Sequence, residues 1–273
     1  MLSKPSVRAP AVAGTFYPGE SRELAQTLAQ MLGTAAHDAP ERSVPKALIA
    51  PHAGYIYSGP VAASVYALLA PARRSITRVV LLGPTHRVAV RGLALPASQA
   101  FATPLGTVEI DRAAVDTLRG MPQVTVSEQA HALEHSLEVH VPFLQTVLDR
   151  FTLVPLAVGH ASAQEVAEVL DALWGGPETL IVVSSDLSHY LSYGDAQAVD
   201  RATAKAILGL ASDLSHEQAC GATPVTGLSQ TAKRRGLKAE LIDLRNSGDT
   251  AGDKNRVVGY GAFAFYEEAR NAR

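Results

Sequence analysis

The chain has 273 residues, of which 47% are hydrophobic and 18% charged, so it is long enough to bury a large core. Its formal net charge of -2 lacks the strong positive charge that is typical of nucleic-acid-binding proteins, and we expect no nucleic-acid partner. No apolar run approaches the roughly 20 residues that a membrane span needs, and we expect no membrane span. The N-terminus has no signal-peptide pattern, and the single cysteine, Cys220, rules out an internal disulfide framework, so we expect a cytoplasmic protein.

The first informative segment is an apolar run over residues 47–50, which predicts a buried strand. The strand ends at Pro51, because proline cannot donate a hydrogen bond to a sheet. His52 follows at once, and Pro60 is well placed to open a helix over residues 61–69. Ligands of open α/β sheets bind outside the carboxyl ends of the strands, so His52 is a candidate ligand or acid–base group. A loop histidine bonded to a backbone carbonyl is the equally weighted alternative.

A second apolar run, residues 77–82, predicts another buried strand that ends in the same way. Gly83, Pro84 and Thr85 follow it and lead to His86. Two strands therefore end in turn-forming residues and a histidine. This repetition favours a shared role for His52 and His86 more strongly than either segment does alone.

The segment over residues 134–148 has apolar residues at helical spacing and predicts an amphipathic helix. We expect His135 and Glu138 to share the opposite face of that helix. An acid and an imidazole three residues apart are also ordinary on a solvated helix, so a structural role is equally expected for this pair.

The last two candidate segments lie in the second half of the chain. The strand predicted over residues 179–183 runs into polar residues that include Asp186 and His189. Cys220 stands just before a helix that we expect to have Thr223 as N-cap and Pro224 as its first residue. A thiol at such a position is expected to have a lowered pKa and to favour the thiolate, the form that binds metals.

Strands and helices alternate along most of the chain, which predicts a single α/β domain over residues 1–273. We expect one open, mostly buried central sheet with helices on both faces. The strand over residues 257–266 has no charge on either face, which predicts that both faces are covered. The remaining expected strands are 92–96, 106–110, 151–158 and 237–244, and the remaining expected helices are 21–32, 111–118, 163–173, 195–208 and 223–235.

Four separate segments thus supply His52, His86, the pair Asp186 and His189, and Cys220 to one predicted rim of the sheet. Imidazole and thiolate ligands suit iron, zinc or copper. Three protein ligands that leave an open position are typical of a catalytic metal site rather than of a structural one.

The same segments, taken in order, resemble the motif series of the Memo family. They read PHAGY at 51–55, GPTH at 83–86, EHSLEVH at 134–140, SSDLSH at 184–189 and CG at 220–221. The segments AGTFYP at 13–18 and NSGD at 246–249 are similar to those of its bacterial members, the type that belongs to the AmmeMemoRadiSam system. The resemblance covers nearly the whole chain.

This resemblance implies a fold shared with the class III extradiol dioxygenases, which are non-haem iron enzymes that open catechol rings. It implies a metal site made of His52, His86 and Cys220, with iron as the expected metal and copper or zinc as alternatives. His189 matches the acid–base histidine of the dioxygenases, Asp186 lies beside the site, and His135 is a further candidate for the same cleft. Because the dioxygenases have a glutamate where this chain has Cys220, the softer thiolate argues against carrying over ring cleavage.

The resemblance also bears on partners. Animal Memo proteins are described as signalling effectors that bind iron or copper, and bacterial relatives are associated with a radical-SAM protein and a small partner.

Two main hypotheses for the function remain. One hypothesis is a non-haem iron redox enzyme that acts on a small, oxidisable molecule, with Asp186 or Glu138 orienting the imidazoles. The other is a non-catalytic metal-binding effector that binds a peptide or partner. A zinc hydrolase fits the ligands but lacks an obvious carboxylate base.

Overall fold

The computed structural model describes residues 6–37 and 43–267. Its strands are β1 (Val7–Arg8), β2 (Ala47–Ala50), β3 (Arg78–Pro84), β4 (Leu93–Leu95), β5 (Ala100–Thr103), β6 (Gly106–Glu109), β7 (Val124–Val126), β8 (Thr152–Val158), β9 (Thr179–Ser184), β10 (His189–Leu191), β11 (Lys238–Asn246) and β12 (Val257–Tyr266). Its α-helices are α1 (Ser21–His37), α2 (Tyr55–Tyr66), α3 (Arg112–Thr117), α4 (Glu128–Ala132), α5 (Val141–Val147), α6 (Ala163–Leu173), α7 (Tyr193–Leu208) and α8 (Ala222–Arg235). Three short 3₁₀ helices are η1 (Ala67–Ala72), η2 (Glu138–His140) and η3 (Ser247–Asp249).

A central mixed sheet organises the chain, in the order β10-β12-β2-β9-β3-β8-β4-β7, with β11 paired to β12. Strands β2, β9, β3 and β8 are parallel, so their carboxyl ends share one edge of the sheet. Strand β12 runs antiparallel to β2 and β11, and β4 antiparallel to β8. A smaller sheet is formed by β1, β5 and β6.

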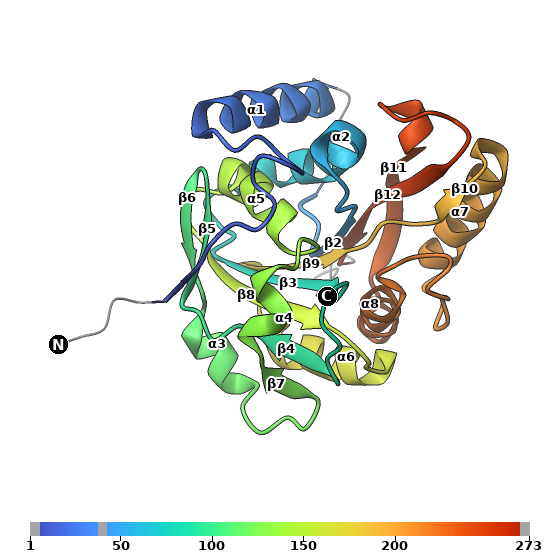
Figure 1. Cartoon of the computed structure of the whole chain (residues 1–273). Coiled ribbons are helices and arrows are strands. Elements are labelled where there is room, and N and C mark those ends of the chain that lie inside the picture. Colours follow the sequence, from blue (N-terminus) through green and yellow to red (C-terminus); the bar gives the residue numbers. More distant parts are fainter. Residues whose placement is uncertain (1–5, 38–42, 268–273) are drawn as a thin grey trace.

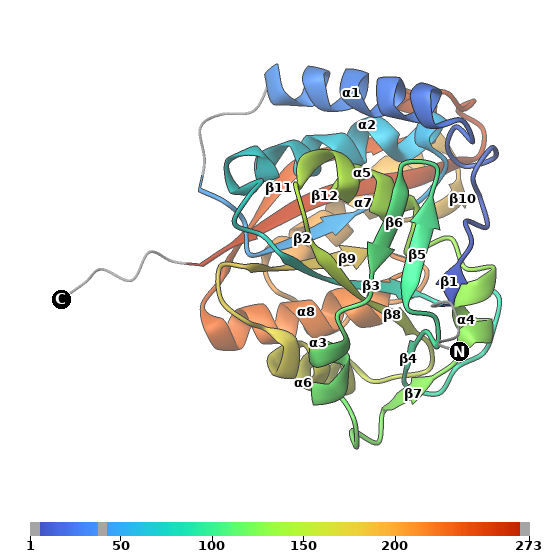
Figure 2. The same ribbon diagram turned by 90° about the vertical axis from the view of Figure 1, so that its left-hand side faces the viewer.

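Helices cover both faces of the central sheet, as the alternation of strands and helices predicts (Figure 1). On one face, α1, α2 and α5 pack on inward-facing residues such as Leu48 and Leu81. On the other face, α6, α7 and α8 pack on residues such as Ile49 and Val80 (Figure 2). Successive strand residues therefore enter opposite cores, and the strands are hydrophobic throughout because both faces are buried.

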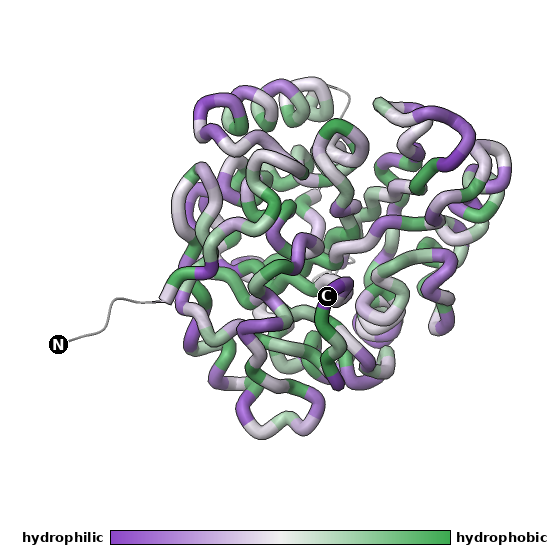
Figure 3. The backbone as a smooth tube through the Cα atoms, viewed as in Figure 1, coloured by the Kyte–Doolittle hydropathy of each residue, from purple (hydrophilic) through white to green (hydrophobic). Residues whose placement is uncertain are grey.

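Hydrophobic residues lie along the central strands, whereas the outward side of α1 carries hydrophilic ones (Figure 3). Strand β12 is buried along almost its whole length, which confirms the prediction that both of its faces are covered. Within the described ranges, no helix is both long and apolar enough to cross a membrane.

The order of the parallel strands creates a switch point in the sheet. The chain passes from β2 through α2 on one face to β3, and from β8 through α6 on the other face to β9. Strand β9 then enters between β2 and β3 and pairs with both. Open α/β sheets bind ligands at the point where neighbouring connections leave on opposite faces.

Several boundaries differ from the predicted ones for local reasons. Helix α2 begins at Tyr55 rather than near Pro60, because the Tyr57 and Ser58 amides already bond to the Gly54 carbonyl. Helix α8 begins at Ala222, so Thr223 lies inside the helix rather than capping it. Helix α1 continues past residue 32 to His37. Helix α6 and strand β12 have the predicted bounds.

The predicted amphipathic helix over residues 134–148 is replaced by η2 and the short helix α5, which Pro142 helps to open. Glu138 is not on a solvated face, which corrects the expectation from the sequence. It is 1% exposed and accepts a 2.5 Å hydrogen bond from Arg8, and it also accepts hydrogen bonds from the Ala11 and Val12 amides and from the Tyr17 hydroxyl. Glu138 therefore fastens the N-terminal segment to the body of the protein.

Strand β12 also shows why a side chain is excluded at Gly259. A Cβ atom at this position would overlap the carboxylate of Asp200, which belongs to α7 and accepts a hydrogen bond from the Ser188 amide. The glycine lets α7 approach the strand backbone closely.

We therefore expect Gly259→Ala to lower the free energy of unfolding by about 1–3 kcal/mol, because the strand and α7 would have to separate. Gly194→Ala is the matched control, since nothing lies within 4 Å of a Cβ there. That control should change stability by less than about 1 kcal/mol. Urea denaturation of both variants measures the difference, and equal effects would contradict the close packing.

Candidate metal centre

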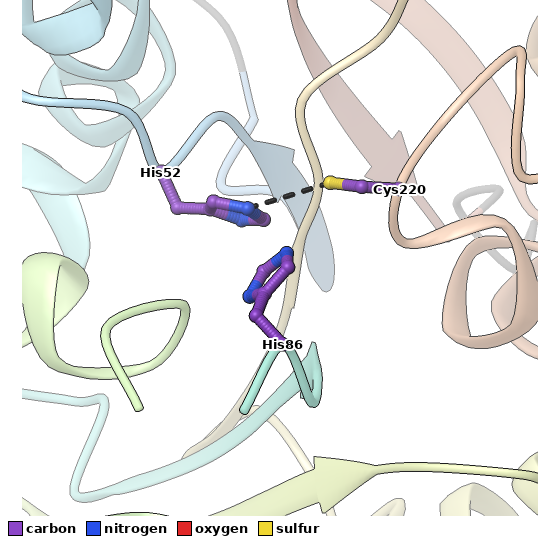
Figure 4. Close-up of side chains that lie close together, drawn as sticks. All are labelled: His52, His86 and Cys220. Carbon is purple, nitrogen blue, oxygen red and sulfur yellow. Dashed lines mark hydrogen bonds between the residues drawn. The ribbon is translucent and has the colours of Figure 1, made fainter. Parts of the chain in front are cut away.

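Three of the side chains singled out in the sequence converge at the carboxyl edge of the sheet (Figure 4). His52 follows β2, His86 follows β3, and Cys220 immediately precedes the turn into α8. The His52 Nε2 atom lies 3.4 Å from the Cys220 Sγ atom. The two imidazole ring centroids are 5.2 Å apart, and one ligand-type atom from each of the three residues lies within 4.8 Å of the others.

This spacing fits a transition-metal ion. Bonds of about 2.0–2.3 Å in tetrahedral geometry place neighbouring ligand atoms roughly 3.5 Å apart. The separation between His52 Nε2 and Cys220 Sγ is close to that value, and small side-chain movements would bring the His86 ring to it as well. Two imidazoles and a thiol form a donor set for iron, copper or zinc.

Ser184, the last residue of β9, fixes the tautomer of His52. Its hydroxyl donates its only hydrogen to the Ser136 carbonyl at 2.6 Å. The hydroxyl can therefore only accept from His52 Nδ1, which lies 2.6 Å away. Because Nδ1 must then carry the hydrogen, Nε2 keeps its lone pair and points that lone pair at Cys220.

Glu134 fixes His86 in the same way. Its Oε1 atom lies 2.9 Å from His86 Nδ1, and its Oε2 atom accepts the His86 amide at 2.6 Å. Burial by itself would raise the pKa of Glu134, but the hydrogen bonds from His86 and the Ser136 amide outweigh burial and lower the pKa to about 2. An ionised Glu134 requires a hydrogen on His86 Nδ1, which leaves Nε2 as the ring nitrogen available to a metal ion.

Cys220 is held by the backbone of Asp186. The Asp186 amide donates to the thiol sulfur at 3.3 Å, and the Cys220 amide donates to the Asp186 carbonyl at 3.2 Å. Burial, followed by the charge of Asp186, raises the pKa of the metal-free thiol to about 12. This is opposite to the lowered pKa expected from a position before a helix, because desolvation dominates over the helix terminus.

The side chain of Asp186 is buried next to the site and contacts the backbone of one ligand residue. It is 4% exposed and accepts the His52 amide at 2.7 Å. Burial raises its pKa to about 7, although the amide hydrogen bond works in the other direction. Asp186 thus positions the backbones of His52 and Cys220 and orients neither imidazole ring. Glu138 orients neither ring either, and Glu134 and Ser184 take that role.

His135 lies against the same cluster. Its ring stacks on His86 at 4.7 Å between centroids, and Phe16 covers it at 4.8 Å. Burial lowers the pKa of His135 to about 4, so its ring is neutral at neutral pH. Its Nδ1 atom is buried with no hydrogen-bond partner. Both oxygens of Glu134 already accept hydrogen bonds, so we interpret Glu134 and His135 as surroundings of His86 rather than as a second metal site.

His189 occupies β10 and lines a cavity of about 820 Å³ together with His86 and Cys220. Burial lowers the pKa of His189 below its usual value, and a hydrogen bond to the Leu187 carbonyl partly offsets this. The cavity also contains His216 and Glu217, from the connection between α7 and α8. His216 is exposed in this connection, and no local sequence pattern indicates that the turn borders the metal ligands.

Ser184 and Glu134 are the functional candidates that the sequence did not assign. Both lie inside the quoted motifs, next to residues that were singled out. Their role depends on partners 132 and 48 residues away in the chain, His52 and His86. For Ser184, the available signal was a polar residue at the end of an otherwise apolar strand, whereas Glu134 follows no strand and had no such signal.

We expect Ser184→Ala to weaken metal binding by roughly 10–100-fold, because the His52 ring would lose the hydrogen bond that fixes its tautomer. The affinity can be measured by competition with a chromophoric chelator, and the tautomer by ¹⁵N NMR of the histidine rings. Ser229→Ala is the control, since Ser229 is also fully buried but its hydroxyl has no hydrogen-bond partner. Unchanged affinity in Ser184→Ala would show that His52 needs no such support.

The chain is similar to several known proteins, and its sequence relatives show its family. Among solved structures, an uncharacterized protein from Escherichia coli K12 aligns with a TM-score of 0.46 and 16% identity, over 80% of this chain and 99% of that chain. A MEMO1 family protein from Aquifex aeolicus is 36% identical over 266 residues, covering 93% of this chain and 97% of the relative. One from Methanosarcina acetivorans is 38% identical over 273 residues, covering 94% and 98%. The family model described as Memo-like protein matches residues 8–264, and the chain belongs to the Memo family.

Proposed function

We propose that the protein is a metal-dependent oxidoreductase that binds iron through His52, His86 and Cys220 and acts on a small organic molecule. The observation that carries this proposal is the convergence of two tautomer-fixed imidazoles and a thiol beside a cavity of about 820 Å³. A purely structural metal site would be closed by a fourth protein ligand and would need no adjoining cavity.

The donor set supports the choice of metal only in part. Two neutral imidazoles and one thiolate suit iron, and they also accept copper or zinc. Iron bound there would supply one-electron and dioxygen chemistry. The thiol must lose its hydrogen when it becomes a ligand, so metal binding should release a proton to solvent.

The residues around the ligands have distinct proposed roles. His189 lines the cavity and has a lowered pKa, so its ring is neutral at neutral pH and suited to accept a proton from a bound substrate. His135 is a second candidate for that role, because its neutral ring lies against His86 and its Nδ1 atom, 3.3 Å from Glu134 Oε1, makes no hydrogen bond. Asp186 holds the ligand-bearing backbones in place.

A second candidate function is a metal-binding effector that docks on a peptide or partner, such as a protein of a radical-SAM system. The exposure of large hydrophobic side chains near the site favours it. Ile56, four residues after His52, is 65% exposed, and Tyr190, next to His189, is 62% exposed. Exposed apolar residues beside a functional site are typical of interaction surfaces.

Metal binding is tested by Cys220→Ser and His86→Ala. Both variants should lose at least about tenfold in affinity for iron, because each removes one of three proposed ligands. His160→Ala is the control, since His160 is exposed and belongs to neither cluster of side chains that could hold a metal ion among the described residues. Elemental analysis of anaerobically purified protein and thermal unfolding without metal complete the measurement. A packing role for Cys220 would instead lower the melting temperature and leave iron binding intact.

Turnover is tested separately by His189→Ala. The iron-loaded parent should consume dioxygen with at least one member of a panel of phenols and catechols, and the variant should keep its iron but lose at least about 100-fold in rate. Full dioxygen consumption by His189→Ala would remove His189 from the reaction. No turnover by the loaded parent, together with stoichiometric iron, would favour the effector function.

A further inference from the structure

The cavity beside the metal ligands has a composition that restricts what it can bind. Its apolar lining comes from Leu191 of β10 and from Val199 and Ala202 of α7. These side chains are half-buried or exposed rather than packed into the core, so they form a lining that is available to a ligand. The volume of about 820 Å³ lies within the range of roughly 300–1,000 Å³ that accommodates a drug-sized organic molecule.

The charge of the lining is the second restriction. Among the described residues that line the cavity, none is lysine or arginine, and Glu217 contributes a carboxylate. A phosphate or carboxylate group placed along this lining, away from the metal ligands, would lose its hydration without gaining a cationic side chain as partner, which is costly. A cationic group would instead meet the carboxylate of Glu217.

Polar side chains line the cavity at the metal ligands and, over residues 215–218, in the connection between α7 and α8. His86, His189 and Cys220 border the cavity together, so a ligand that enters it can place one end at the metal centre. The rest of such a ligand would extend along α7, which Figure 1 shows beside β10 at the outer end of the sheet.

From this geometry we infer that the ligand of this cavity is an uncharged or cationic organic molecule with an aliphatic body. Its polar end meets the metal centre, and its body packs on Leu191, Val199 and Ala202. This inference rests on the proposed function, because it places the polar end at the metal formed by His52, His86 and Cys220. It excludes substrates that carry a phosphate or carboxylate group on the body that lies against these three residues.

A series of n-alkyl hydroxamic acids tests the inference, with two to eight carbons and zinc as a redox-inert metal. The hydroxamate end binds the metal, and the alkyl chain samples the apolar lining. Calorimetry should show affinity rising by roughly two- to fourfold for each added methylene group. An eight-carbon hydroxamate with a terminal carboxylate should bind at least about tenfold more weakly than one with a terminal amine. Affinity independent of chain length, or a preference for the carboxylate, would overturn the inference.

Two alanine-to-aspartate variants on α7 locate the effect. Ala202→Asp puts a charge in the lining and should remove the gain from chain length while leaving zinc content unchanged. Ala198→Asp is the matched control, because Ala198 lies one turn earlier on the same helix and is exposed without lining the cavity. The control should keep the chain-length dependence of the parent. Equal responses from both variants would contradict a binding site along Val199 and Ala202.

Zinc content separates this inference from the proposed function. A parent protein that binds zinc but shows no chain-length dependence refutes the cavity assignment and leaves the metal site standing. A parent that binds no zinc refutes the metal site, and n-alkyl amides added to the metal-free protein then test the cavity alone. Their affinity should also rise with chain length and fall in Ala202→Asp, and a flat response would overturn the inference.

Discussion

The parallel pairing of β9 between β2 and β3 is the constraint on which the candidate site depends. It places the carboxyl ends of three strands that are distant in the sequence at one edge of the sheet, with Ala50 opposite Ser184 and Leu82 opposite Val183. His52 and His86 follow the two outer strands, and Ser184 ends the strand between them. Any shift in this register would separate the ligand imidazoles from the hydroxyl that orients one of them.

Buried polar groups stabilise this edge of the sheet. The segment around η2 contributes two buried carboxylates, which contact different parts of the protein. Glu134 points to His86 and fixes its ring, whereas Glu138 points to Arg8 and the N-terminal segment. Arg8 also donates to the carbonyls of His131 and Glu134. Removing one partner of a buried ion pair leaves an uncompensated charge. The N-terminal segment and the segment around η2 therefore hold each other in place. The N-terminal segment is thus coupled to the site, and its Phe16 contacts the ring of His135.

Without metal, the His52 imidazole and the Cys220 thiol are both neutral, and both are groups that bind soft metal ions. Burial lowers the pKa of His52 well below its usual value and raises that of Cys220 to about 12, so both remain uncharged without metal. The neutral imidazole and thiol can lie 3.4 Å apart without repulsion. A bound cation would then replace the thiol hydrogen and provide the charge that the buried thiolate needs.

The sequence by itself determined the elements that depend on local patterns. Apolar runs identified β2, β3, β8 and β9, because strands buried on both faces are hydrophobic throughout, and the residues that follow three of them identified His52, His86 and Asp186. Cys220 and His189 were also found, and the order of the motifs identified the family. Each of these features is contained within a few consecutive residues, so propensity and spacing suffice to recognise it.

Only the tertiary structure decided what each of these residues touches. The start of α2 at Tyr55, the burial of Glu138 against Arg8, and the raised pKa of Cys220 all differ from the expectations, because each depends on desolvation or on partners far along the chain. The supports of the site are of the same kind, since Ser184 is separated from His52 by 132 residues. Contacts of this type follow from strand order and register, and a local sequence pattern contains neither.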